Sequence, residues 1–309
     1  MKWRHIRRLA VGAAMRAKFA VLQAVAPQKA ISHAVKLWCT YPKGRHCDLR
    51  PAASAAGAST LKCLPARRVG EVVIESWGSG PVVYLLHGWG GWRGQLGAFV
   101  APLVASGHQV VAIDAPGHGS SGPGYLGPVR GTIMELIEAL ESASTEFGPA
   151  AAVVAHSLGT TAAGVAVRRG LHTKHLVLIA ANAGFEQLVE LFSHNLKLNA
   201  RTRAGLVAAH NQMTCCSKLS DFDLTHLSKD WDAPRTLFVH DRHDKQVPFT
   251  SAEKVAANWP GSTFLSTNGL GHQRILADPG VVSAVTEFVT AEREASLLLA
   301  DSRCHDFND

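Results

Sequence analysis

Short apolar runs alternate with longer helical segments along most of the chain. Val82–Leu86 and Ala150–Ala155 are continuous apolar runs without a charged residue, which is typical of strands buried on both faces of a sheet. Val69–Trp77 instead alternates apolar and polar positions and ends at the turn signal Gly-Ser-Gly-Pro. From residue 69 onward strands alternate with helices. This order predicts an α/β fold, with a mostly parallel central sheet and helices on both faces.

The same pattern gives an expected position for each element. We expect strands at residues 60–64 (weak), 69–77, 82–86, 109–113, 150–155, 175–180, 235–240 and 262–266. We expect helices at residues 93–106, 131–147, 158–170, 185–198, 202–213, 250–258 and 281–299.

Residues 181–230 break the alternation of strands and helices. An insertion of this size after a strand is expected to lie over the site as a helical lid. The chain then divides into an N-terminal helical arm with a linker (1–59), an α/β core (60–180 and 231–299), the lid (181–230) and a frayed tail (300–309).

The first 38 residues are predicted to be helical, because Trp3, Ile6 and Leu9 recur at helical spacing. Residues 1–47 hold ten Lys/Arg and no acidic residue, whereas the rest of the chain has 21 basic against 24 acidic residues. The net charge of +7 therefore comes from this arm. That distribution argues against a body that binds nucleic acid.

Several interpretations of the arm stay open. A basic amphipathic helix on an anionic membrane surface and a helix packed on the domain fit equally well. A secretory signal peptide fits less well because Arg16 and Lys18 interrupt its apolar region, although Ala24–Ala26 resembles a cleavage site. An organelle transit peptide is compatible with the Arg-rich, acid-free sequence. Residues 1–38 are therefore the candidate for peripheral membrane contact.

Composition narrows the class of protein. Apolar residues make up 47% of the chain, enough for a large core, and no uncharged apolar run reaches the ~18 residues of a membrane span. The six cysteines are too sparse for a disulfide framework, and no Cys/His spacing is typical of zinc sites. We expect a cytoplasmic protein with no metal and no cofactor, and the oligomeric state is left open.

Ser157 lies at the junction of a predicted strand and a predicted helix. The sequence Ala155-His156-Ser157-Leu158-Gly159 has the pattern of a nucleophile elbow, a tight turn that exposes a reactive serine. Such a turn crowds the positions two before and two after the serine, and both are small here. The N–H of Leu158 would face the attacked carbonyl at a helix N-terminus, whose dipole favours negative charge. A tight turn without chemistry is the alternative interpretation of this pattern alone.

Two other strand ends carry glycine-rich loops. His87–Gly91 follows a central strand, and the N–H of Trp89 is the candidate for a second oxyanion donor. We expect His87 to hold this loop by hydrogen bonds, and the polar residues of Asp114–Ser121 to tie their own loop together. Trp89 and Trp92 either line a substrate pocket or cover the edge of the core.

Three predicted strand ends carry Ser157, Asp244 and His272, in that order along the chain. Together with the loops at 87–91 and 114–119, these motifs resemble the α/β-hydrolase fold family from about residue 60 to residue 297. The resemblance implies that Ser157 is the nucleophile, Asp244 the triad acid and His272 the base.

The implied roles follow from chemistry. His272 would take the hydroxyl proton of Ser157 and return it to the leaving group, while Asp244 would fix the imidazole tautomer. The family's oxyanion hole maps onto the backbone N–H groups of Trp89 and Leu158.

Some positions near these motifs differ from the pattern or compete with it. Ala155 stands where Gly is more usual, as in some lipases that resemble this pattern. Asp241 is a rival acid, but Asp244 is preferred because it precedes Gln-Val-Pro, as in the family. His156 and His243 flank the implied catalytic positions and are expected to pack or to face solvent.

Serine in the elbow disfavours relatives of epoxide hydrolases and haloalkane dehalogenases, which resemble this fold but use Asp there. We predict a carboxylesterase- or lipase-like serine hydrolase that cleaves esters of a small to medium, fairly apolar acyl group. A thioesterase or acyltransferase, or a non-catalytic binding protein that keeps the fold, are the alternatives. Lid residues expected to contact the substrate or to pack the lid are Phe185, Leu188, Phe192 and Met213.

Overall fold

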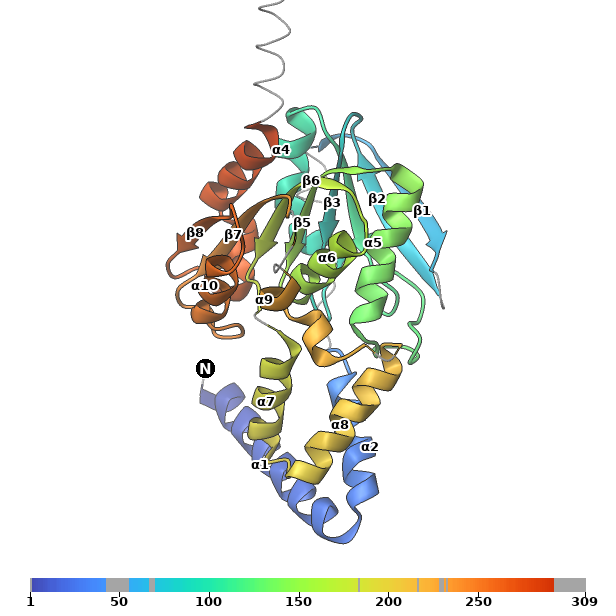
Figure 1. Cartoon of the computed structure of the whole chain (residues 1–309), viewed down its shortest axis with the longest axis vertical. Coiled ribbons are helices and arrows are strands. Elements are labelled where there is room, and N and C mark those ends of the chain that lie inside the picture. Colours follow the sequence, from blue (N-terminus) through green and yellow to red (C-terminus); the bar gives the residue numbers. More distant parts are fainter. Residues whose placement is uncertain are drawn as a thin grey trace, which may run out of the picture.

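The computed structural model describes residues 2–42, 56–66, 70–182, 184–215, 217–227, 231 and 233–291, with only the backbone of residues 2–10. Its centre is an eight-stranded sheet with the order β1-β2-β4-β3-β5-β6-β7-β8 (Figure 1). β2 pairs antiparallel with β1 and β4, and the remaining pairs are parallel. The predicted mostly parallel sheet is confirmed.

The described elements agree closely with the expected positions. The strands are β1 (Ser59–Pro65), β2 (Glu71–Trp77), β3 (Val82–Leu86), β4 (Gln109–Asp114), β5 (Ala150–His156), β6 (Thr173–Ile179), β7 (Arg235–Asp241) and β8 (Thr263–Thr267). The α-helices are α1 (Lys2–Val25), α2 (Pro27–Trp38), α4 (Val100–Ala105), α5 (Ile133–Phe147), α6 (Leu158–Arg168), α7 (Phe185–Leu196), α8 (Ala200–Met213), α9 (Leu224–Leu227), α10 (Phe249–Ala257), α11 (Gly271–Arg274) and a closing helix at 279–291. Short 3-10 helices are η2 (Arg93–Phe99), η3 (Leu219–Phe222) and η4 (Ile275–Ala277). Most of the predicted linker (43–55), the end of the predicted closing helix (292–299) and the predicted tail (300–309) lie outside the described residues.

Helices cover both faces of the sheet, as Figure 1 shows, and the sheet separates two apolar cores. In β3, Tyr84 and Leu86 face the core formed with α5 and α6. The alternate residues Val83 and Leu85 face the core formed with η2, α4 and the closing helix. Burial on both faces explains why β3 is apolar at every position.

The single helix predicted at 93–106 is instead η2 followed by α4. Gly94 and Gly97 have low helix propensity, and Pro102 has no N–H to continue an α-helical ladder from the preceding turn. Pro102 is tolerated where it lies, in the first turn of α4, because an N–H there would have no intrahelical acceptor.

The predicted lid and the predicted N-terminal arm pack together. α7 and α8 follow β6, and the hairpin of α1 and α2 lies beside them at one end of the molecule (Figure 1). α2 packs against α8, and α1 packs against α2 and α7. We call these four helices the cap. Among the described helices, none is both long and apolar enough to cross a membrane.

Candidate active site

Ser157 stands in the predicted turn between β5 and α6. Its φ of 54° and ψ of −123° lie outside the usual regions for a residue with a side chain. The Ser157 N–H donates to the carbonyl of Ile179 at 2.9 Å, which fixes the turn to the neighbouring strand. Gly159 must be small, because a Cβ there would lie 2.4 Å from the carbonyl oxygen of His87. This crowding is the physical basis of the small-residue pattern around the serine.

Ser157, His272 and Asp244 form one chain of hydrogen bonds. His272, in α11, has its Nδ1 2.6 Å from Asp244 Oδ2 and its Nε2 3.0 Å from Ser157 Oγ. A carboxylate can only accept, so Nδ1 carries the imidazole proton and Nε2 is left to accept from the serine hydroxyl. The arrangement can therefore move a proton from Ser157 to His272.

Asp241, the rival acid, has a different role in the structure. Its carboxylate accepts from the N–H of His243 at 2.9 Å, the hydroxyl of Thr267 at 2.8 Å and the N–H of Leu270 at 2.9 Å. Burial alone would raise the pKa of Asp241, but the backbone of Gly271 together with these three hydrogen bonds lowers it to about 2. Asp241 thus ties the loops that carry Asp244 and His272 to each other.

The electrostatics favour an ionised Asp244. Burial would raise its pKa, but the hydrogen bond from His272 and those from the N–H groups of Gln246 and Val247 outweigh burial, and the pKa is lowered. His156 lies beneath the imidazole and donates from Nε2 to the carbonyl of His272 at 2.9 Å. Burial, followed by repulsion from His272, lowers the pKa of His156 to about 3, so it orients His272 as a neutral group.

The loop after β3 lies against Ser157. A Cβ on Gly88 would be 2.8 Å from the Cβ of Ser157, so only glycine permits this approach. His87 is buried and anchors the loop as predicted: the Ala115 N–H donates to Nε2 at 3.2 Å, and Nδ1 donates to the Gly88 carbonyl at 2.7 Å. Among the described residues, no group accepts a hydrogen bond from the N–H of Trp89 or from the N–H of Leu158, the first residue of α6.

The polar residues of the loop after β4 tie that loop together, as predicted. Asp114 is buried and accepts from the N–H of Ser120 at 2.8 Å and from the N–H of Arg93 at 2.6 Å, and it pairs with the Arg93 guanidinium. The Ser121 hydroxyl donates to the Asp114 carbonyl at 2.6 Å. This loop is therefore structural.

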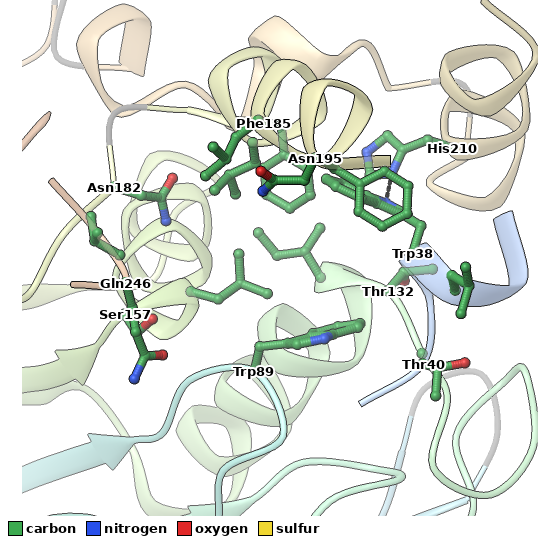
Figure 2. A pocket seen from close by; sticks show the side chains of 18 of the residues that line it. Trp38, Thr40, Trp89, Thr132, Ser157, Asn182, Phe185, Asn195, His210 and Gln246 are labelled. Carbon is green, nitrogen blue, oxygen red and sulfur yellow. Dashed lines mark hydrogen bonds between the residues drawn. The ribbon is translucent and has the colours of Figure 1, made fainter. Parts of the chain in front are cut away.

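A cavity of about 390 Å³ opens beside Ser157, between the cap and the carboxyl end of the sheet (Figure 2). The predicted residues Trp89, Phe185, Leu188 and Phe192 all line it. The remaining wall is also largely apolar, with a few polar groups that include Asn182, Asn195, His210 and Gln246. The cavity is thus suited to an apolar group attached to a polar reacting centre.

Residues 83–285 match the sequence profile of the alpha/beta hydrolase family. The chain belongs to the alpha/beta hydrolase family. The match covers the sheet from β3 onward, the loop at Trp89, Ser157 and His272, as the sequence motifs predicted. A search of curated proteins finds no significant match to this hydrolase.

Solved structures share the fold of this alpha/beta hydrolase at low sequence identity. It is similar to an esterase from Exiguobacterium antarcticum, with 17% identity and a TM-score of 0.56 over 75% of this chain and 100% of that chain. It is similar to the thioesterase domain from the curacin biosynthetic pathway, with 16% identity and a TM-score of 0.55 over 76% and 100%. A membrane phospholipase A matches with 16% identity and a TM-score of 0.58 over 95% and 99%.

Two predicted substrate contacts of this hydrolase lie elsewhere. Trp92, which precedes η2, and Met213, at the end of α8, are not among the described residues that line the cavity. The sulfur of Met213 instead lies 3.9 Å from the Cys39 thiol, which donates to it, so Met213 packs α8 against the segment after α2. Neither residue lines the cavity beside Ser157, and packing, the other interpretation of Met213, describes its observed contact.

Sequence reasoning also missed the part of the cavity wall that comes from α2. Leu37 and Trp38 line the cavity, and Trp38 Nε1–H donates to His210 Nδ1 at 3.4 Å (Figure 2). Burial lowers the pKa of His210 to about 4, so its imidazole is a neutral acceptor for Trp38. A tryptophan at the end of a helical stretch was the available signal. Nothing in its spacing showed which distant segment it would meet.

Proposed function

We propose that this chain is a serine hydrolase that cleaves carboxylic esters through an acyl-enzyme on Ser157. The observation that carries the proposal is the continuous hydrogen-bond chain, with Ser157 Oγ 3.0 Å from His272 Nε2 and His272 Nδ1 2.6 Å from Asp244. A serine hydroxyl is almost fully protonated at neutral pH, so it needs such a base within reach to attack a carbonyl.

In the first half of the reaction, Ser157 Oγ bonds to the ester carbonyl carbon while its proton passes to His272 Nε2. The carbonyl oxygen becomes negative, and the N–H groups of Trp89 and Leu158 stabilise that charge, supported by the N-terminal end of α6. The C–O bond to the alcohol then breaks, and His272 gives its proton to the departing oxygen. Ser157 is left acylated.

In the second half, water replaces the alcohol. His272 takes a proton from the water, whose oxygen attacks the acyl carbon, and returns that proton to Ser157 Oγ as the carboxylic acid leaves. Asp244 stays ionised throughout and stabilises the imidazolium that forms twice in each cycle.

The cavity supports a substrate with a small to medium, fairly apolar acyl group. A volume of about 390 Å³ is near the lower end of the range for small-molecule sites. Phe185, Leu188 and Phe192 of α7 and Trp38 of α2 supply apolar surface to bury an acyl chain, which favours esters over strongly charged acyl groups.

The test is hydrolysis of p-nitrophenyl esters of graded acyl length, compared with acyl thioesters. We expect turnover that is highest for short or medium chains and labelling of Ser157 by a fluorophosphonate probe. Ser157→Ala is expected to lose about 10⁶-fold in kcat and all labelling. Folded protein that neither labels nor turns over any ester would contradict the proposal, and turnover of thioesters far above that of all esters would redirect it to a thioesterase.

A further inference from the structure

Residues 39–42 run from the end of α2 to the loop after β3, which holds Trp89. The Tyr41 N–H donates to the carbonyl of Val129 at 3.0 Å, and the Gly131 N–H donates to the carbonyl of Cys39 at 3.0 Å. These two bonds fix the backbone of Tyr41 beside the loop that precedes α5. The direction in which the Tyr41 side chain leaves the backbone is therefore fixed by hydrogen bonds at residues 39 and 41.

The ring of Tyr41 is 5% exposed and lies between two aromatic partners. It packs edge-on against Trp89, with ring centroids 4.5 Å apart and an interplanar angle of 78°. It also lies 3.9 Å from the ring of His118, on the loop after β4. Gly131 leaves room for the phenol, because a Cβ there would lie 1.9 Å from the phenol oxygen. Tyr41 thus fills the space between the β4 loop and the Trp89 indole.

The next residue continues this contact along the same loop. A Cβ on Gly90 would lie 3.0 Å from Cδ of Pro42, so the backbone at Gly90 is close to the proline ring. At the other end of the loop, His87 bonds to Gly88 and to the β4 loop. The backbone N–H of Trp89 therefore lies between an anchor made by the core and one made by residues 41 and 42.

The hydroxyl of Tyr41 does not contribute to these contacts. It is buried and has no hydrogen-bond partner among the described residues. Burial, followed by the charge of Glu135, raises the pKa of Tyr41, so the phenol stays neutral and cannot act as a base. The position requires an aromatic ring and not a hydroxyl group.

We propose that Tyr41 is a positioning residue: its ring holds Trp89 so that the Trp89 backbone N–H meets the oxygen that becomes negative during ester cleavage. The inference rests on the proposed function. Loss of an oxyanion donor costs ~10²–10³ in kcat, and a misplacement of about 1 Å costs ~10². Residues 41 and 42 then help to position the donor, next to the part of the cavity wall that Leu37 and Trp38 supply.

The experiment compares Tyr41→Ala with Tyr41→Phe in the full chain. Tyr41→Ala is expected to lower kcat by about 10–100-fold with little change in KM, because the donor acts in the transition state and not in substrate binding. Tyr41→Phe keeps the ring and is expected to stay within about twofold of wild type. Binding of a trifluoromethyl ketone, whose adduct with Ser157 carries the oxyanion, is expected to weaken in Tyr41→Ala by the same factor as kcat/KM.

Phe19→Ala is the matched control for cap stability, because it removes a fully buried ring from a cluster with Ala30 and Ala34. That cluster touches Leu37 and Phe192 of the cavity wall but not the Trp89 loop, so a change in KM and not in kcat is the expected effect on activity. It is expected to lower the melting temperature and to keep kcat within about threefold. Tyr41→Leu replaces Tyr41→Ala if the latter does not fold, with a loss in the same direction.

Wild-type kcat and inhibitor affinity in folded Tyr41→Ala would overturn the role of Tyr41 and leave the proposed function standing. An equal loss of kcat in Tyr41→Phe or in Phe19→Ala would also overturn it, because the hydroxyl or general cap stability would then be responsible. If the wild-type chain turns over no ester and no thioester, the proposed function fails and this inference fails with it.

Discussion

Asp241 and Asp244 are only three residues apart, yet their carboxylates serve different purposes. Asp244 Oδ2 faces the imidazole of His272 at 2.6 Å, while its Oδ1 accepts from two backbone N–H groups. Asp241 has no contact with that imidazole and instead joins the ends of β7 and β8 through Thr267 and Leu270. One carboxylate holds the imidazole of His272, and the other holds two loops together.

Asp244→Asn and Asp241→Asn therefore form a matched pair. Asp244→Asn is expected to lower kcat for ester hydrolysis by about 10⁴-fold, because an amide does not hold the imidazole in the required tautomer. Asp241→Asn is expected to reduce the free energy of unfolding by about 1–3 kcal/mol, since a buried oxygen that accepts two bonds is lost. Steady-state kinetics and urea unfolding on both variants measure these effects, and a comparable loss of kcat in Asp241→Asn would exchange the two roles.

At this scale the sequence predicts chemistry better than packing. Ser157, Asp244 and His272 were found because a reactive group needs a particular neighbour pattern, such as the small residues around the elbow. Met213 and His210 could not be sorted the same way. Both lie on α8, but only His210 lines the cavity, and helical periodicity does not say how far a helix is rotated about its axis.

Helix α1 presents two different faces. Phe19 is buried against α2, so the interpretation of a packed helix describes one face. Elsewhere on the helix Val11, Val21 and Val25 are exposed by 58%, 60% and 75%. The whole helix carries six Lys/Arg and no acidic residue. Packing and contact with an anionic membrane surface are therefore compatible, and membrane contact stays a prediction.

That prediction is tested by co-sedimentation of the full chain with phosphatidylglycerol vesicles. We expect binding that weakens in high salt, and the double variant Val21→Glu/Val25→Glu is expected to bind at least about tenfold more weakly. Leu61→Glu, at an exposed position of β1, is the control and is expected to bind like wild type. Equal binding to neutral phosphatidylcholine vesicles, or no binding by the wild type, would rule the surface out.

Elements with a strong local signal were predicted, and those governed by distant partners were not. The continuous apolar strands could be read because burial on both faces leaves no polar position. The break at η2 does not follow from the apolar pattern, because Pro102 acts on the backbone hydrogen bonds and leaves the helical spacing of apolar residues intact. The packing of α2 on α8 could not be predicted from the sequence. It depends on contacts between residues far apart along the chain, such as Trp38 and His210, which are separated by 172 positions.

The molecule as a whole keeps several histidines neutral inside the fold. Burial is the main cause of a lowered pKa in each of His87, His118, His156, His210 and His240. All five lie near the carboxyl end of the sheet or in the cap, where the candidate site is built. Their protonation would place charge in the interior, and burial outweighs the carboxylates that lie near His87 and His240.

Stability is therefore expected to fall as the pH falls from neutral. An unfolded histidine takes up a proton near pH 6.5, whereas folded His210 does so only near its pKa of about 4, so acid favours the unfolded state through this window. One such residue lowers the free energy of unfolding by about 2 kcal/mol near pH ~5. Denaturant unfolding at a series of pH values measures the slope.

His210→Gln keeps an acceptor for Trp38 and is expected to remove about that share of the acid sensitivity. His243→Gln changes an exposed histidine and is expected to leave the pH dependence as it is. An unfolding free energy that does not change between about pH 7 and about pH 5 would contradict this account of the buried histidines.

The bond between Trp38 and His210 also bears on how the protein is made. During translation α2 leaves the ribosome well before α7 and α8 exist, so a nascent hairpin has none of its final partners to pack against. We expect it to dock only after the later helices have formed. The part of the cavity wall that comes from α2 would then be added only once residues 185–213 have been made, so a chain that stops short of α8 would lack a closed cavity beside Ser157.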